Sequence, residues 1–189
     1  MDDRLTIEEK HVLLTMARAT LERGLRGQPL PPLDLESMTP HLRESGASFI
    51  TLTVDGNLRG CIGALEPYQP LAQDVREHAL AAALEDPRFP PVTTEELNQI
   101  RIEISRLTLP RTLDYGDAAD LVGLLRPNTD GVILRDGLRR ATYLPQVWEK
   151  IPDTTEFLDS LCAKMGSPPD TWRRKHIEVL TYQVEEFHE

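Results

Sequence analysis

The segment 58–63, Leu-Arg-Gly-Cys-Ile-Gly, places a thiol, a guanidinium and two glycines within six residues. The forked guanidinium of Arg59 is suited to binding a carboxylate or a phosphate. If it lies near Cys61 in space, the thiolate is favoured and the sulfur becomes a nucleophile at neutral pH. Glycines inside a strand indicate a bulge or the close approach of a backbone or ligand, which we expect at Gly60 and Gly63. The alternative for the cysteine is a small buried apolar residue.

A second cluster, Asp-Pro-Arg-Phe-Pro-Pro at 86–91, is rich in proline. Prolines at this density stiffen a loop, and a stiff loop can hold Asp86 and Arg88 in set positions. Arg88 would then complete an anion-binding cleft beside the thiol. The other interpretation is a helix terminator whose Phe89 fills a gap in the core, and the two interpretations can hold together.

A third segment, 141–149, contains Tyr143, Gln146 and Trp148. The two rings offer large rigid surfaces, each with one polar group, that can line a pocket. We therefore include all three residues as candidate binding residues. Core packing is the alternative for either ring.

Among the histidines, His78 follows the cysteine segment and could act as a general base for Cys61, although no sequence pattern forces that contact. The remaining histidines, the cysteines and the carboxylates lack the spacing of a metal site. The chain also has neither a P-loop nor a dinucleotide fingerprint. We therefore expect neither a metal nor a cofactor.

Hydrophobic periodicity and turn signals define the elements that must position these residues. Thr6 and Glu9 have the spacing of a capping box before the first helix, and turn signals at 55–57 and 135–137 indicate two hairpins. In chain order, the patterns predict helices over 7–25, 71–84, 118–126 and 154–165, and strands over 47–54, 58–63, 100–105, 131–134, 138–144 and 176–185.

Hairpins outnumber strand–helix–strand units in this order of elements. That favours an α+β fold with antiparallel, hairpin-rich sheets and flanking helices. A chain of 189 residues is one domain over 1–189, or two intertwined lobes with the second half starting near residue 110.

Composition excludes several classes of protein. No apolar run approaches the roughly 18 residues of a membrane span, and residues 1–4 do not resemble a signal peptide. Two cysteines in different surroundings indicate reduced thiols, so we expect the cytoplasm. The net charge of −10 disfavours nucleic-acid binding, and the basic run at 173–176 is interpreted as a solvated surface.

Four segments in the same order resemble the AmmeMemoRadiSam system protein A family, whose shared segment is the AMMECR domain: Leu-Arg-Gly-Cys-Ile-Gly, Asp-Pro-Arg-Phe-Pro-Pro, Asp-Gly-Val-Ile-Leu at 130–134 and Thr-Tyr-Leu-Pro-Gln-Val-Trp-Glu at 142–149. The resemblance implies a larger and a smaller lobe around a cleft that contains the cysteine motif. It also implies a pathway shared with a Memo-like and a radical-SAM protein. No reaction is attached to the family. This chain lacks the three-cysteine motif of radical-SAM enzymes, so it would be their partner.

Two functional hypotheses remain close. In the first, the protein is an enzyme or accessory subunit of that pathway, in which Arg59 fixes an anionic group, Cys61 is the nucleophile or acid, and Arg88 completes the anion site. In the second, it is a non-catalytic binding or scaffold protein that recognises a peptide or protein partner. A regulator of a nucleic-acid process is a weaker third alternative, against which the charge argues.

Overall fold

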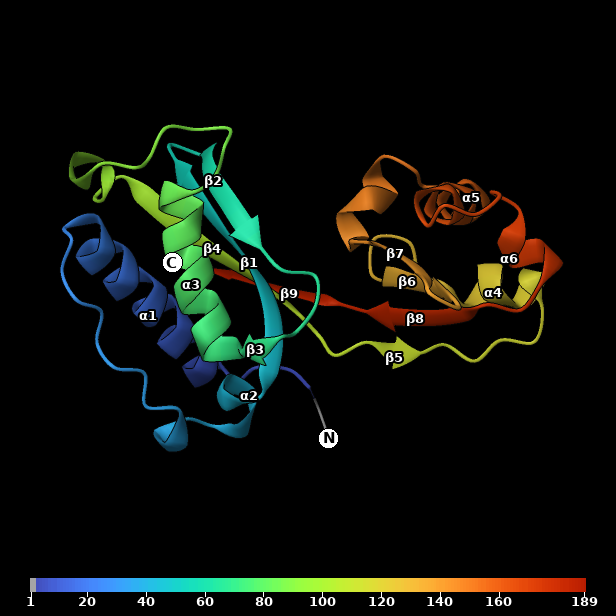
Figure 1. Ribbon diagram of the computed structural model, residues 1–189, viewed down its shortest axis with the longest axis horizontal. Coiled ribbons are helices and arrows are strands. Elements are labelled where there is room, and N and C mark those ends of the chain that lie inside the picture. The colour runs from blue at the N-terminus through green and yellow to red at the C-terminus, as the bar shows by residue number, and fades with distance from the viewer. Residues whose placement is uncertain (1–2) are drawn as a thin grey trace. The chain divides into compact units, whose positions relative to one another are not determined.

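In the computed structural model, which describes residues 3–189, the chain divides into two units, each built on its own sheet (Figure 1). Unit 1 contains the chain up to Thr108 together with Glu185–Glu189, and unit 2 contains Leu109–Val184. The expected α+β class with antiparallel hairpins is confirmed. No helix among the described residues is both long and apolar enough to cross a bilayer.

The sheet of unit 1 begins with the predicted hairpin, formed by β1 (Ser45–Val54) and β2 (Asn57–Gly63). The turn residues Asp55 and Gly56 both have positive φ, 51° and 79°. A two-residue turn of this kind matches the right-handed twist of the flanking strands. The Asp-Gly signal therefore sets both the position and the register of the hairpin.

Three more strands complete this sheet. They are β3 (Gln69–Pro70), which pairs with the start of β1, β4 (Ile100–Leu107), which pairs along the length of β1, and β9 (Val184–His188) beyond β4. The path β2-β1-β4-β9 leaves β2 at one edge. The isoleucines of β4 alternate with polar residues and are buried, as the period of two predicts.

Two long helices, α1 (Ile7–Leu25) and α3 (Leu71–Leu84), lie on one side of this sheet (Figure 1). α3 packs on β1 and β2, and α1 packs on α3 and β4. Between α1 and β1 the chain forms a short 3-10 helix, η1 (Leu35–Ser37), and the four-residue α2 (Pro40–Arg43). The apolar core of unit 1 therefore lies between the helices and one face of the sheet.

The start of α1 follows the capping box predicted from sequence. The backbone N–H of Glu9 donates to the Thr6 hydroxyl, and the Thr6 N–H donates to the Glu9 carboxylate. Gly27, with φ of 64°, lies just after the helix. Ile7 fits the predicted apolar spacing but is 83% exposed, because it lies in the first turn on the outer face.

Unit 2 contains a four-stranded sheet in the order β5-β8-β6-β7. Its strands are β5 (Arg111–Thr112), β6 (Gly131–Asp136), β7 (Arg139–Tyr143) and β8 (Glu178–Tyr182), all paired antiparallel. The hairpin of β6 and β7 is the second one predicted from an Asp-Gly signal. It is confirmed.

The helices of unit 2 are α4 (Ala118–Leu124), α5 (Thr154–Lys164) and α6 (Thr171–Arg174), with the 3-10 helix η3 (Pro145–Glu149). α5 begins at its predicted Asp153 cap, whose side chain accepts the N–H of the third helical residue. α4 ends two residues earlier than predicted because the next residue is already extended. These helices enclose a second apolar core.

The predicted final strand over 176–185 is wrong in one respect. The structure has two strands there, β8 in the sheet of unit 2 and β9 in the sheet of unit 1, separated at Gln183. The two strands are separated by a single residue, and the local sequence carries no information about which sheet each strand joins.

Candidate functional site

The peptide groups of Cys61 are held by side chains on the open edge of the unit 1 sheet. Its N–H donates to Asp86 Oδ2 at 2.8 Å, and its carbonyl accepts from Arg88 Nη2 at 3.3 Å. Because β2 is an edge strand, these groups have no neighbouring strand to pair with. Asp86 and Arg88, which we call the Asp86–Arg88 clamp, take the place of that strand.

The two side chains of the clamp are also bound to each other. Arg88 Nε lies 2.9 Å from Asp86 Oδ1 and Nη2 lies 2.6 Å from Oδ2, while the Arg88 backbone N–H donates to Oδ1 at 3.0 Å. The Asp86 side chain is 3% exposed and that of Arg88 is 54% exposed. The hydrogen bond from Arg88, helped by the N–H of Cys61, holds the pKa of Asp86 well below its usual range. Asp86 is therefore ionised throughout the physiological range.

Cys61 is half-buried, and its sulfur has one hydroxyl donor and a cation nearby. Thr51, its cross-strand partner on β1, donates its hydroxyl to Sγ at 3.4 Å. The guanidinium of Arg88 donates to the carbonyl of Cys61, and the pKa of Arg88 is raised first by the hydrogen bond to Asp86 and further by the Cys61 thiol. A donor and a cation beside sulfur can hold negative charge that develops there in a reaction.

Arg59 has partners of its own within unit 1. Leu52 pairs with Gly60 while Thr53 pairs with Leu58, so Arg59 is the extra residue of a β-bulge. The pleat is therefore interrupted between the guanidinium and the thiol. The bulge lies next to Gly60, one of the two glycines at which an irregularity was expected.

The guanidinium of Arg59 reaches the loop that contains the clamp. It binds the Glu96 carboxylate through Nε at 2.7 Å and Nη2 at 3.1 Å, and donates to the carbonyls of Pro90 and Pro91. The hydrogen bond from Arg59 lowers the pKa of Glu96 to about 2. Arg59 thus holds the 86–96 loop against β2, and its guanidinium is already bound to the Glu96 carboxylate.

Gly60 and Gly63 permit close backbone approach within the chain itself. A Cβ at Gly60 would lie 2.0 Å from the carbonyl oxygen of Ala82 on α3. A Cβ at Gly63 would lie 2.3 Å from the carbonyl oxygen of Ser48 on β1. The two glycines therefore allow α3 and the hairpin to pack at contact distance.

His78 lies on the other face of the sheet from the Cys61 sulfur. Gly60 faces α3, and strand alternation turns the next side chain away from the helix. His78 Nδ1 is 3.2 Å from the buried Asp74 carboxylate, which also accepts the Ser48 hydroxyl at 2.6 Å. Within the described part of the chain, no hydrogen bond joins His78 to Cys61.

The candidate residues of unit 2 lie in and around its core. Trp148 is fully buried, stacks on Phe157 with ring centroids 3.6 Å apart, and donates its Nε1–H to the Asp130 carbonyl at 2.7 Å. Tyr143 contacts the same phenyl ring edge-on, and its hydroxyl lies 2.9 Å from Ser160 Oγ. Gln146 is exposed.

Two residues of the site were missed from sequence. Thr51 could have been found by counting back from the Asp-Gly turn, but the bulge at Arg59 shifts the register by one residue. Glu96 stands three residues after Thr93 in a capping box at η2 (Thr94–Glu96). That spacing was available, whereas the pairing with Arg59, 37 residues away, was not.

Similar proteins place the chain in a family. The AMMECR1 family model matches residues 14–187. A protein of Methanothermobacter thermautotrophicus is 40% identical over 190 residues, which cover 98% of this chain and 96% of that one. Protein MJ0810 of Methanocaldococcus jannaschii is 36% identical over 192 residues, covering 98% and 92%.

A solved structure agrees with the sequence match. The crystal structure of the uncharacterized protein PH0010 from Pyrococcus horikoshii aligns with a TM-score of 0.74 at 33% identity, covering 98% of this chain and 93% of that one. The resemblance inferred from four short segments therefore extends over the whole fold. The chain belongs to the AMMECR1 family.

Proposed function

We propose that the protein is a component of a pathway shared with a Memo-like and a radical-SAM protein, and that it acts there through the thiol of Cys61. The observation that carries the proposal is the setting of the sulfur. It is half-buried, accepts the Thr51 hydroxyl, and lies beside the guanidinium of the Asp86–Arg88 clamp. A donor and a cation near a sulfur stabilise negative charge that develops on it in a reaction.

In this role Arg88 is the better candidate than Arg59 for holding an anionic group of a substrate. The Arg59 side chain is 15% exposed, binds Glu96 through Nε and Nη2, and donates to the Pro90 carbonyl through Nη1. Arg88 uses Nε and Nη2 for Asp86 and Cys61, and its Nη1 makes no hydrogen bond with the described residues. One side of this guanidinium therefore remains available to a ligand.

The proposal is tested by alkylation with iodoacetamide, in which the sulfur displaces iodide and forms a thioether. Cys162 is the internal control because it is fully buried, and burial raises the pKa of its thiol. We expect Cys61 to be modified at least about tenfold faster than Cys162 in the folded protein. Equal rates, or modification of Cys61 only after unfolding, would contradict a working thiol.

A non-catalytic scaffold is the second candidate, and one observation favours it. Both cations of the site are already paired with carboxylates of the chain, and His78 lies on the opposite face of the sheet. The Cys61→Ala variant separates the two functions. A scaffold would still retain a Memo-like or radical-SAM partner in a pull-down and support the pathway, whereas the thiol proposal expects a folded variant with no pathway activity.

A further inference from the structure

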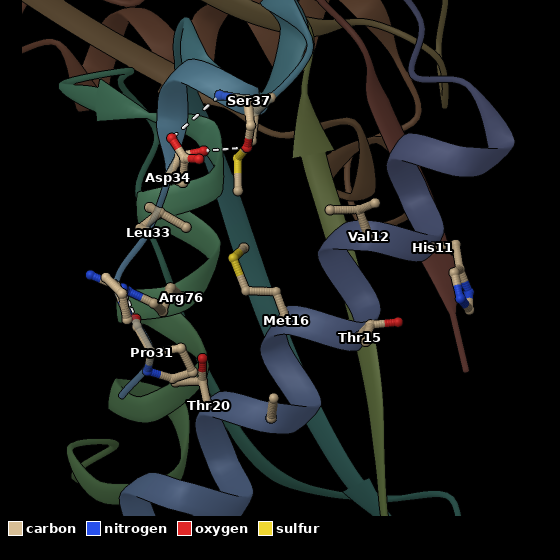
Figure 2. Close-up of a pocket in the computed structure, with 13 residues that line it drawn as sticks. His11, Val12, Thr15, Met16, Thr20, Pro31, Leu33, Asp34, Ser37 and Arg76 are labelled. Atoms are coloured by element: carbon tan, nitrogen blue, oxygen red, sulfur yellow. Dashed lines mark hydrogen bonds between the residues drawn. The ribbon is translucent and has the colours of Figure 1, made fainter. Parts of the chain in front are cut away.

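A pocket of about 490 Å³ lies in unit 1 between α1 and the loop over residues 28–38 (Figure 2). Its walls are mostly apolar: Val12, Met16 and Ala19 come from α1, and Leu33 and Met38 come from the loop. Cavities of this volume with apolar walls are typical of small-molecule sites. None of the residues of the Asp86–Arg88 clamp lines it, so its role is independent of the function proposed for Cys61.

The loop that closes the pocket is held in place. Prolines at 29, 31 and 32 restrict its backbone. The carbonyl of Pro31 accepts from Arg76 Nη1 on α3 at 3.2 Å, and the Ser37 hydroxyl donates to the Asp34 carbonyl at 3.0 Å. A pocket with a fixed wall costs little ordering entropy when a ligand enters, which favours binding.

One polar group inside the pocket has no partner. Thr20 is only 2% exposed, and its hydroxyl, whose remaining accessible surface faces the pocket, makes no hydrogen bond with the described residues. A helical threonine commonly donates to the carbonyl four residues earlier, and buried hydroxyls are nearly always bonded. Figure 2 shows the Thr20 oxygen directed into the space between α1 and the loop. The hydroxyl is therefore placed to meet a group inside the pocket.

We propose that this pocket binds a small neutral molecule with an apolar body and one oxygen function, a hydroxyl or a carbonyl. The body packs against Met16, Met38 and Leu33, and the oxygen bonds to Thr20. A neutral ligand is favoured because the lining contains both a cation and a carboxylate, Arg76 and Asp34, so neither sign of charge gains.

The probe for this site is 1-hexanol, observed through the methyl groups of ¹³C-labelled methionines. The chain has four methionines. Met16 and Met38 line the pocket, whereas Met165 is buried in the core of unit 2 and reports on non-specific effects. We expect the methyl resonances of Met16 and Met38 to shift and saturate as hexanol is added, and that of Met165 to stay unchanged. Unmoved Met16 and Met38 resonances would overturn the proposal.

Variants of α1 sharpen the test. Thr20→Val keeps the shape and removes the hydroxyl, so we expect about fivefold weaker binding of hexanol with unchanged thermal stability. The control is Thr15→Val, which also changes a pocket threonine, but one that solvent reaches. Equal hexanol affinities of the two variants would contradict a hydrogen bond between Thr20 and the ligand.

Filling the pocket is the complementary test. Ala19→Phe projects a ring into the space and should abolish the shifts, with thermal unfolding as the check that the variant folds. Shifts of Met16 and Met38 that follow protein concentration and not hexanol concentration would identify a second copy of the chain as the occupant, and would also overturn the proposal.

Discussion

The two units contain the same ion-pair arrangement in different settings. In unit 1 Asp86 binds Arg88, and in unit 2 Asp130 binds Arg126. In both pairs the carboxylate is 3% exposed, the guanidinium is more than half exposed, and the carboxylate also accepts the backbone N–H of its arginine. The local geometry is thus nearly the same, and only the third partner differs.

That third partner decides what the pair does. The Asp86 carboxylate accepts the peptide N–H of Cys61 on an open sheet edge, beside a half-buried sulfur. In unit 2 the backbone carbonyl of Asp130 accepts the Nε1–H of Trp148, whose indole ring is fully buried against Phe157. The first pair therefore holds the peptide of a half-buried cysteine, and the second contains a residue whose backbone holds a core ring.

The largest expected effect on stability comes from removing Trp148 from the core of unit 2. Trp148→Ala removes a fully buried ring and leaves a cavity, so we expect the free energy of unfolding to fall by about 3–5 kcal/mol. Tyr143→Phe is the matched control, because it deletes only the hydroxyl that meets Ser160 and should cost about 1 kcal/mol. Denaturant unfolding followed by circular dichroism measures both, and a small loss for Trp148→Ala would show that the ring is not a core residue.

The contact between β2 and α3 comes next in size. Gly60→Ala would place a Cβ 2.0 Å from the Ala82 carbonyl oxygen, a backbone atom that cannot move aside, so we expect a loss of about 1–3 kcal/mol. Gly123→Ala is the control, since nothing lies within 4 Å of a Cβ there and the residue is inside α4. That change should stabilise unit 2 by about 0.5–1 kcal/mol. Equal changes in the free energy of unfolding for Gly60→Ala and Gly123→Ala would contradict the close contact between β2 and α3.

Acid titration tests the carboxylate of the clamp. Because the folded pKa of Asp86 is lowered, the stability it contributes is fully present above its unfolded pKa of about 3.9 and is lost as pH falls toward the folded value. We therefore expect Asp86→Asn to melt below the wild type at neutral pH. The gap in melting temperature should shrink as the pH is lowered to about 2. A gap that is constant with pH would mean that the charge of Asp86 contributes nothing.

The smallest effect is expected from Thr51→Val, which removes the hydroxyl that donates to the Cys61 sulfur. We expect alkylation of Cys61 to slow by about two- to fivefold, because one weak donor to sulfur is lost. Thr53→Val, on the same strand beyond the bulge, is the control and should leave the rate unchanged. Faster alkylation in Thr51→Val would show that the hydroxyl only shields the sulfur.

Local signals in the sequence predicted most of the elements. The Asp-Gly turns gave both hairpins, and alternation in β4 identified its buried face. The assignment of β8 and β9 to different sheets could not be predicted, because it depends on which edge each strand meets. The family resemblance was predicted from four segments and is confirmed.

The site was predicted less completely than the fold. Cys61, Asp86 and Arg88 do lie together, although they are 25 and 27 residues apart. The sequence could not show that Arg59 binds Glu96, because a salt bridge across 37 residues leaves no local pattern. It also could not show that Thr20 is buried without a partner, since the pocket is formed by a loop with little regular structure.

The most direct test of the account compares Cys61 alkylation in Arg88→Gln and Arg126→Gln. Both substitutions remove an exposed guanidinium from a buried aspartate, so they disturb folding to a similar extent. Only Arg88 binds the peptide of Cys61 and feels the charge of its thiol, and we therefore predict that Arg88→Gln slows iodoacetamide modification of Cys61 severalfold while Arg126→Gln leaves it unchanged. Equal rates in the two variants would contradict the claim that the Asp86–Arg88 clamp prepares Cys61 for chemistry.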